Sequence, residues 1–142
     1  MDPNFKRTLI LENYEKPFHK GLVDDSTYLK ENKNNSSCID NFDIQLKMND
    51  NKIEDIRFEG EACAIAVSSA SISIQKLIGK TKEEALQLAD IFLRMIKGEA
   101  SDDEIDQLEE ASVLKDISHM PARVKCAVLG WRTLNEMFKD GK

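Results

Sequence analysis

The sequence is short of several residue types, and each shortage excludes a class of protein. Its 142 residues include six glycines and three prolines, with 6% aromatic side chains, which is unlike collagen-like, mucin-like or low-complexity chains. No apolar run approaches the roughly 18 residues that indicate a transmembrane helix. Near the N-terminus, Asp2, Asn4 and Lys6 stand where a signal peptide would have an apolar stretch. We therefore expect a cytoplasmic domain with no membrane partner.

The sequence also lacks an excess of positive charge, because 26 acidic residues outnumber 20 basic ones and the formal net charge is −6. Seven acidic side chains lie between Glu99 and Glu110 without a basic one, whereas the rest of the chain holds 20 basic and 19 acidic residues. The acidic segment lacks the glycine and carbonyl spacing of a calcium loop, so we interpret it as a solvated helix face. Because no concentrated basic stripe is present, we expect no nucleic-acid partner.

Hydrophobic periodicity and capping residues predict the secondary structure. Helical spacing predicts a helix over 3–15 that Pro17 would end. Alternating apolar residues on both sides of a turn at 49–51 predict a β-hairpin with one buried face, and Gly60 is expected to break the second strand. The other expected elements are a brief strand at 27–29, an exposed polar loop at 31–37, and helices that begin at or near Cys63, Thr81, Ser101 and Pro121.

These elements predict a single α+β domain over residues 1–142, because the chain is long enough for one hydrophobic core but short for two. A small antiparallel sheet of three strands should pack against helices, with the candidate metal site at one end of the sheet.

Cysteine is rare as well, and its placement is informative. Three cysteines are an odd number, which argues against a disulfide framework. Cys38 precedes Asp40 in a C-x-D spacing, Cys63 lies where the hairpin meets a helix, and Cys126 lies early in the last helix. Three thiolates and one carboxylate can complete a tetrahedral zinc shell. From spacing alone, three buried structural cysteines are the commoner explanation, because no C-x-x-C pair is present.

The residues around the cysteines carry a resemblance to a known family. Four segments carry this resemblance, namely 37–40 (SCID), 58–71 (FEGEACAIAVSSAS), 79–81 (GKT) and 121–127 (PARVKCA), the last together with Trp131. Together, in this order, they resemble the SufU/IscU (NifU N-terminal domain-like) family of iron–sulfur cluster assembly proteins. The resemblance covers nearly the whole chain and implies a SufE/NifU-like fold.

The resemblance also implies the chemistry of the site. It implies that Cys38, Asp40, Cys63 and Cys126 bind Zn²⁺, and that Cys38 accepts persulfide sulfur from a SufS-like, pyridoxal-phosphate-dependent cysteine desulfurase. The sulfur would then pass to an iron–sulfur scaffold or apoprotein acceptor. A cysteine in a loop moves at lower cost than one in a helix, which favours Cys38 for this role. Arg123 matches an arginine of the SufU motif and is expected to act beside the metal–thiolate cluster, although a surface arginine is the alternative.

Two features of the chain resemble the SufU branch of the family. Residues 98–120 resemble its insertion, and Lys125 stands where the IscU branch has histidine. Ile39 and Ala62 replace family glycines. His19 and His119 match no ligand position, and we interpret both as surface residues.

Two other functions remain open at the level of sequence. One is a scaffold that assembles a transient [2Fe-2S] cluster on the same four residues, because thiolates and carboxylates bind iron as well as zinc. The other is a structural zinc module for protein interaction, in which no cysteine is reactive.

Overall fold

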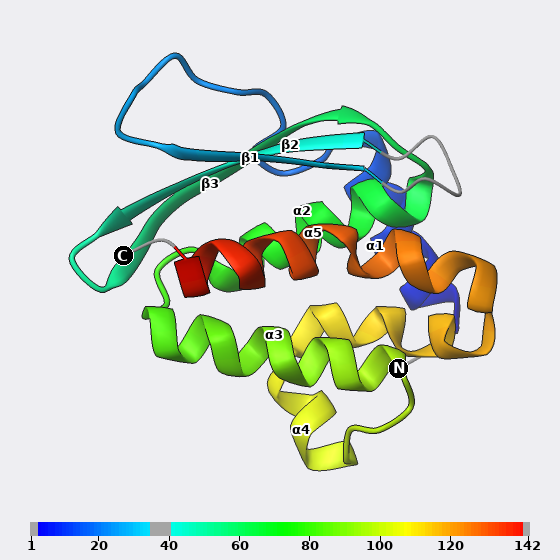
Figure 1. Ribbon diagram of the computed structural model, residues 1–142. Coiled ribbons are helices and arrows are strands. Elements are labelled where there is room, and N and C mark those ends of the chain that lie inside the picture. Colours follow the sequence, from blue (N-terminus) through cyan, green and yellow to red (C-terminus); the bar gives the residue numbers. More distant parts are fainter. Residues whose placement is uncertain (1–2, 35–40, 141–142) are drawn as a thin grey trace.

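The computed structural model describes residues 3–34 and 41–140, which form a layered α+β domain (Figure 1). The elements in chain order are α1 (Pro3–Glu15), β1 (Leu29–Asn34), β2 (Asn41–Asn49), β3 (Lys52–Glu61), α2 (Ala64–Leu77), α3 (Lys82–Ile96), α4 (Asp102–Gln107), the 3₁₀ helix η1 (Glu109–His119) and α5 (Pro121–Asp140). This architecture confirms the predicted class, a three-stranded antiparallel sheet with helices.

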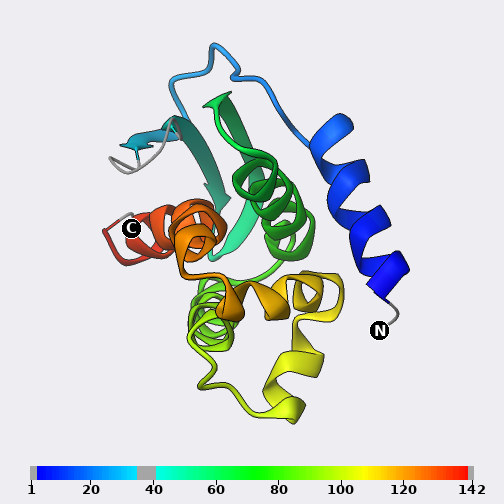
Figure 2. The same cartoon turned by 90° about the vertical axis from the view of Figure 1, so that its right-hand side faces the viewer.

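The sheet has the strand order β1-β2-β3, and both pairs are antiparallel. Apolar residues that alternate along β2 and β3, such as Phe42, Ile44 and Phe58, are buried beneath α2 and α5. A further layer, formed by α3, α4 and η1, lies on the other side of these two helices (Figures 1 and 2). Phe92 of α3 stacks on Trp131 of α5 with ring centroids 4.4 Å apart, which joins the two helical layers.

The helices begin where their capping residues predict. Thr81 and Glu84 form a reciprocal capping box at α3, and Ser101 and Glu104 form another at α4. Each box satisfies amide donors that the first turn of a helix leaves without partners. The predicted starts of α2, α3, α4 and α5 are confirmed, as are the bounds of α1 and the hairpin turn at Asp50 and Asn51.

Two expectations about the strands are wrong. The first strand does not end at Leu29 but runs from Leu29 to Asn34, through residues that we expected to form an exposed loop. Its backbone pairs with β2 from Leu29↔Leu46 to Asn34↔Asn41. Because the pairing uses backbone groups, an edge strand can join the sheet even when its side chains are polar. Gly60 also does not break the second strand, because β3 continues to Glu61.

The segment between α1 and β1 covers part of the sheet face that points away from the helices. Gln45 of β2 is buried there, and its side-chain amide exchanges two 2.8 Å hydrogen bonds with the backbone of Val23. Gly21 lies beside β3, where its amide donates to the Phe58 carbonyl at 2.7 Å. The second face of the sheet is therefore partly buried too.

Candidate metal centre

Cys63 lies at the junction between β3 and α2. It is the N-cap residue of α2, with extended backbone angles (φ −70°, ψ 166°), and its carbonyl accepts the first helical hydrogen bond from Val67 at 3.0 Å. Its side chain makes no capping hydrogen bond, and the residue is half-buried against the core. The positive end of a helix favours a thiolate over a thiol, so this position suits a metal ligand.

Cys126 lies in the second turn of α5 and is only 2% exposed. Its neighbour Ala127 accepts a 2.6 Å hydrogen bond from Ser69 of α2, and a side chain on Gly130 would lie 3.5 Å from Ala70. These contacts show that α2 and α5 pack closely. Both helices begin at the same end of the molecule, on the right in Figure 1, so Cys63 and Cys126 belong to the same end of the fold.

The first residue of β2, Asn41, also lies at this end of the fold. Cys38, Ile39 and Asp40 lie outside the described residues, so their predicted roles remain predictions. The chain that carries them joins β2 at Asn41, which pairs with Glu61. Because Glu61 is two residues before Cys63, Asn41 lies where the chain turns from β3 into α2.

Gly60 permits the close approach of the two strands at this point. Its φ is +147°, and a Cβ atom there would lie 1.9 Å from the carbonyl oxygen of Asn41. No L side chain fits that space without moving the backbone. The glycine in the segment 58–71 therefore has a geometric role beside the candidate metal centre.

The other candidate residues have distinct positions. Arg123 is exposed on the first turn of α5, three residues before Cys126, and Lys125 is also exposed. Ala62 is half-buried against the core. Within residues 3–34 and 41–140, no group of three or more histidine, cysteine, aspartate or glutamate side chains is arranged to hold a metal ion.

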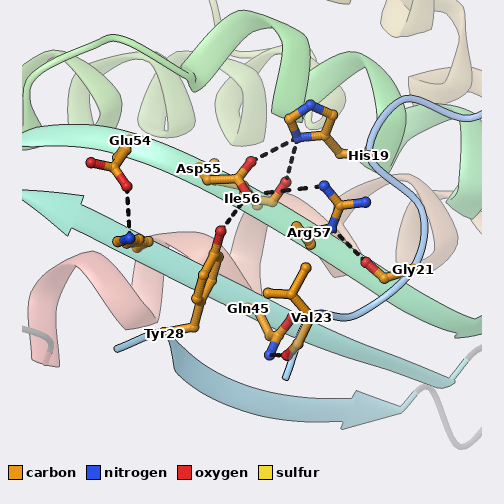
Figure 3. Close-up of polar contacts among 10 residues, drawn as sticks. His19, Gly21, Val23, Tyr28, Gln45, Glu54, Asp55, Ile56 and Arg57 are labelled. Carbon is orange, nitrogen blue, oxygen red and sulfur yellow. Dashed lines mark hydrogen bonds and ion pairs between the residues drawn. The ribbon is translucent and has the colours of Figure 1, made fainter. Parts of the chain in front are cut away.

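A polar network that sequence reasoning missed lies on the sheet face away from the helices (Figure 3). Asp55 accepts a 2.6 Å hydrogen bond from Tyr28, and the Nδ1 atom of His19 lies 2.7 Å from its other carboxylate oxygen. The hydrogen bond to Asp55, together with burial and the carboxylate charge, raises the pKa of Tyr28 to about 12. No motif marks these residues, because they come from separate segments and meet only in the fold.

The two histidines that we interpreted as surface residues differ in their exposure. His19 is half-buried in this network and stacks on Phe18, with ring centroids 4.0 Å apart. His119 is exposed at the end of η1.

In the part of the chain that the structure describes, no helix combines the length and apolar character needed to cross a bilayer.

Comparison with known proteins identifies the family. Residues 6–127 match the family described as the NifU-like N terminal domain. The chain belongs to the NifU-like N-terminal domain family. A curated relative from Bacillus subtilis, the zinc-dependent sulfurtransferase SufU, is 38% identical over 130 residues, which are 92% of this chain and 86% of the relative.

Other NifU-like N-terminal domain proteins carry a different functional name. The iron–sulfur cluster assembly scaffold protein IscU of Streptococcus pyogenes is 37% identical over 92% of this chain and 80% of its own length. A crystal structure of a putative iron–sulfur cluster assembly scaffold protein for the SUF system, from Fervidobacterium islandicum, has a TM-score of 0.79 and 31% identity, with 92% of this chain and 93% of that chain covered. The family membership predicted from the sequence is confirmed, and the relatives are named for two different roles in cluster assembly.

Proposed function

We propose that this protein is a zinc-dependent sulfurtransferase of iron–sulfur cluster assembly that accepts sulfur on Cys38. The observation that carries the proposal is the likeness to the Bacillus subtilis sulfurtransferase over 92% of the chain, at 38% identity. Lys125 supports it, because in the resemblance described above the IscU branch has histidine directly before the third cysteine, where this chain has lysine. The donor in this proposal is a pyridoxal-phosphate-dependent cysteine desulfurase that carries a persulfide.

The donor set fits zinc. Cys63 and Cys126 would hold the ion together with Cys38 and Asp40, and three sulfur ligands with one oxygen ligand suit tetrahedral Zn²⁺. The position of Cys63 at the N-terminus of α2 favours its thiolate form. When bound, zinc would supply positive charge that keeps the cysteine ligands deprotonated at neutral pH.

The transfer step is a displacement at sulfur. The Cys38 thiolate attacks the outer sulfur of the donor persulfide, so that a new sulfur–sulfur bond forms on Cys38 while the sulfur–sulfur bond of the donor breaks. The donor cysteine leaves as a thiolate, and no external oxidant is needed. In this proposal Arg123, which is exposed three residues before Cys126, would attract anionic sulfur species to this end of α5.

Mass spectrometry tests the acceptor directly. Wild-type protein, Cys38→Ser and Asp40→Asn are each incubated with a cysteine desulfurase and cysteine, and then analysed as intact proteins and as peptides. We expect the mass of one added sulfur atom on the Cys38 peptide of the wild type and none on Cys38→Ser. Sulfur transfer that persists in Cys38→Ser would contradict the proposal and favour a structural zinc module.

Arg123 has a matched control on the same helix. Arg123→Ala should lower the rate of sulfur transfer, whereas Arg132→Ala, which alters another exposed arginine of α5, should leave it unchanged. Equal rates in the wild type and Arg123→Ala would remove Arg123 from the proposal.

The second candidate function is a scaffold for a [2Fe-2S] cluster, which the likeness to the Streptococcus pyogenes IscU at 37% identity favours. Metal analysis of protein purified without oxygen distinguishes the two functions. Zinc that stays bound through turnover supports sulfur transfer. A labile cluster that passes to an apoprotein supports the scaffold.

A further inference from the structure

An apolar groove lies between α1 and η1, which are neighbours in the fold (Figure 2). It has a volume of about 460 Å³, and its apolar walls are formed by Ile10, Leu11, Val113, Ile117 and Met120. Leu11 is 46% exposed and Met120 is 49% exposed, which is unusual for large apolar side chains that line one groove. Ile117 and Val113 are buried, so they form the floor.

The spacing of the wall residues follows two helices. On one side, η1 contributes Val113 and Ile117, and Met120 follows directly after this helix. On the other side, α1 contributes the adjacent residues Ile10 and Leu11. Two neighbouring helices with apolar ridges present the kind of groove into which a third helix inserts its own apolar residues at three- and four-residue spacing. The geometry therefore favours a helical occupant.

The charges around the groove favour an acidic occupant. Lys6 of α1 forms an ion pair with Asp116 of η1, with 3.0 Å between Nζ and Oδ2. The carboxylate that lines the groove is therefore neutralised by a lysine of this chain. Arg7 also lines the groove and is exposed. A hydrogen bond from Lys6 lowers the pKa of Asp116, and nearby His119 and Lys115 lower it further. Apart from the Lys6–Asp116 pair, the one charged side chain among the described residues that line the groove is Arg7, which is basic.

We propose that the α1–η1 groove binds an amphipathic helix of a partner protein, whose apolar residues contact Leu11 and Met120 and whose carboxylates lie beside Arg7. Met120 directly precedes α5, which carries Arg123 and Cys126. A helix bound in the groove would thus lie next to the end of the molecule that holds the candidate metal centre. The proposal does not depend on sulfur transfer, because it concerns the surface and not the reaction.

A designed peptide of about four helical turns tests the groove. It carries leucine at three- and four-residue spacing and glutamate on both flanks, and it is added to the ¹⁵N-labelled full chain in an NMR titration. We expect saturable shifts for residues of α1 and η1, and no shifts with a peptide of the same composition in scrambled order. The same peptide with lysine in place of glutamate should bind about tenfold more weakly, because its cations would lie beside Arg7.

Variants of exposed residues locate the binding surface without disturbing the core. Leu11→Ser with Met120→Ser should weaken peptide binding by about tenfold or more, and Arg7→Glu should weaken it by several-fold. Tyr14→Ser is the matched control, because Tyr14 is 46% exposed on the same helix and does not line the groove. Circular dichroism verifies that each variant is folded.

Three results would overturn this proposal. The first is unchanged binding in the Leu11→Ser, Met120→Ser double variant, or no shifts at millimolar peptide. The second is concentration-dependent self-association of the chain that the double variant abolishes, which would make a second copy the occupant. The third is binding to vesicles of phosphatidylcholine and phosphatidylserine that the double variant abolishes, which would make the surface a membrane contact.

Discussion

At the scale of single residues, Gly60 determines how the sheet meets the candidate metal centre. Its φ is positive, and the carbonyl oxygen of Asn41 occupies the space that a Cβ atom at this position would need. We expect Gly60→Ala to lower the free energy of unfolding by about 3 kcal/mol, because backbone strain and a backbone clash combine. Urea denaturation followed by the fluorescence of Trp131, the single tryptophan, measures the change.

Gly79 supplies the control for this substitution. It also has a positive φ, of +89°, but nothing lies within 4 Å of the position its Cβ would occupy. Gly79→Ala should therefore carry only the backbone strain, about 1 kcal/mol. Equal losses of stability in the two variants would show that the approach of Asn41 is not what requires glycine at position 60.

Tyr28 provides a second residue-scale prediction. Its pKa is raised to about 12 by the hydrogen bond to Asp55, by burial and by the carboxylate charge. In a Tyr14→Phe background, ultraviolet absorbance should show Tyr28 titrating near pH 12, and Asp55→Asn should move this titration toward the ordinary value of 10.0. The stabilisation is complete below about pH 10 and is lost as the pH rises through about 12. An unchanged titration in Asp55→Asn would contradict the role of the hydrogen bond.

At the scale of elements, Glu104 joins α4 to α3. Its carboxylate caps α4 through Ser101 and forms a two-point ion pair with Arg94, with 2.9 Å between Nη1 and Oε1. The ion pair and the capping bond lower the pKa of Glu104 to about 2, from an ordinary value of 4.5. This stabilisation is present above about pH 4.5 and is lost as the pH falls through about 2.

Glu104→Gln should therefore lower Tm by a few degrees at neutral pH and flatten the fall of Tm in acid. Asp103→Asn removes another carboxylate from the first turn of α4 and is the control, since it does not touch the Arg94 pair. Thermal unfolding between pH 2 and pH 7, monitored by circular dichroism, distinguishes them. If both variants follow the same pH dependence, the ion pair does not stabilise α4 on α3.

The elements that the sequence predicts well are those with a signal in their own residues. Thr81 and Ser101 cap helices through partners three positions away, so their helix starts can be read locally. The strand from Leu29 to Asn34 has no such signal, because it joins the sheet through backbone pairing with β2 and through the side chain of Asn32, which bonds to Asn41 and Asp43. The network of His19, Tyr28 and Asp55 escapes prediction for the same reason, since its members meet through tertiary contacts.

At the scale of the whole molecule, the sequence predicts the two helical positions of the candidate site but not the geometry that joins them. Cys63 could be assigned to a helix N-terminus and Cys126 to the last helix from periodicity alone. The close packing of α2 on α5 depends on Gly130 and Ser69, which no periodic pattern singles out. Cys38 and Asp40 lie outside the described residues, and their part in the site stays a prediction.

The distribution of the core predicts how the molecule responds to metal removal. The buried side chains come from β2, β3, α2, α3, α4, η1 and α5, and they include Phe42, Phe92 and Trp131 at 0% exposure, so the folded state does not depend on one ion. Zinc held by the four proposed ligands would stabilise only the folded state, by mass action. Chelation should therefore lower Tm by on the order of 10 °C while the helical circular dichroism is retained at 25 °C.

A variant that lacks one proposed zinc ligand is the control for the chelation experiment. Cys63→Ser should lose the response of Tm to chelator, because it removes a proposed ligand at a half-buried position without enlarging the core. Added zinc should restore Tm in the wild type but not in this variant. Small zinc domains unfold outright when the metal is removed, because they lack an independent core. If the chelated protein behaves in that way, the metal and not the layered packing of α2, α3 and α5 maintains the fold.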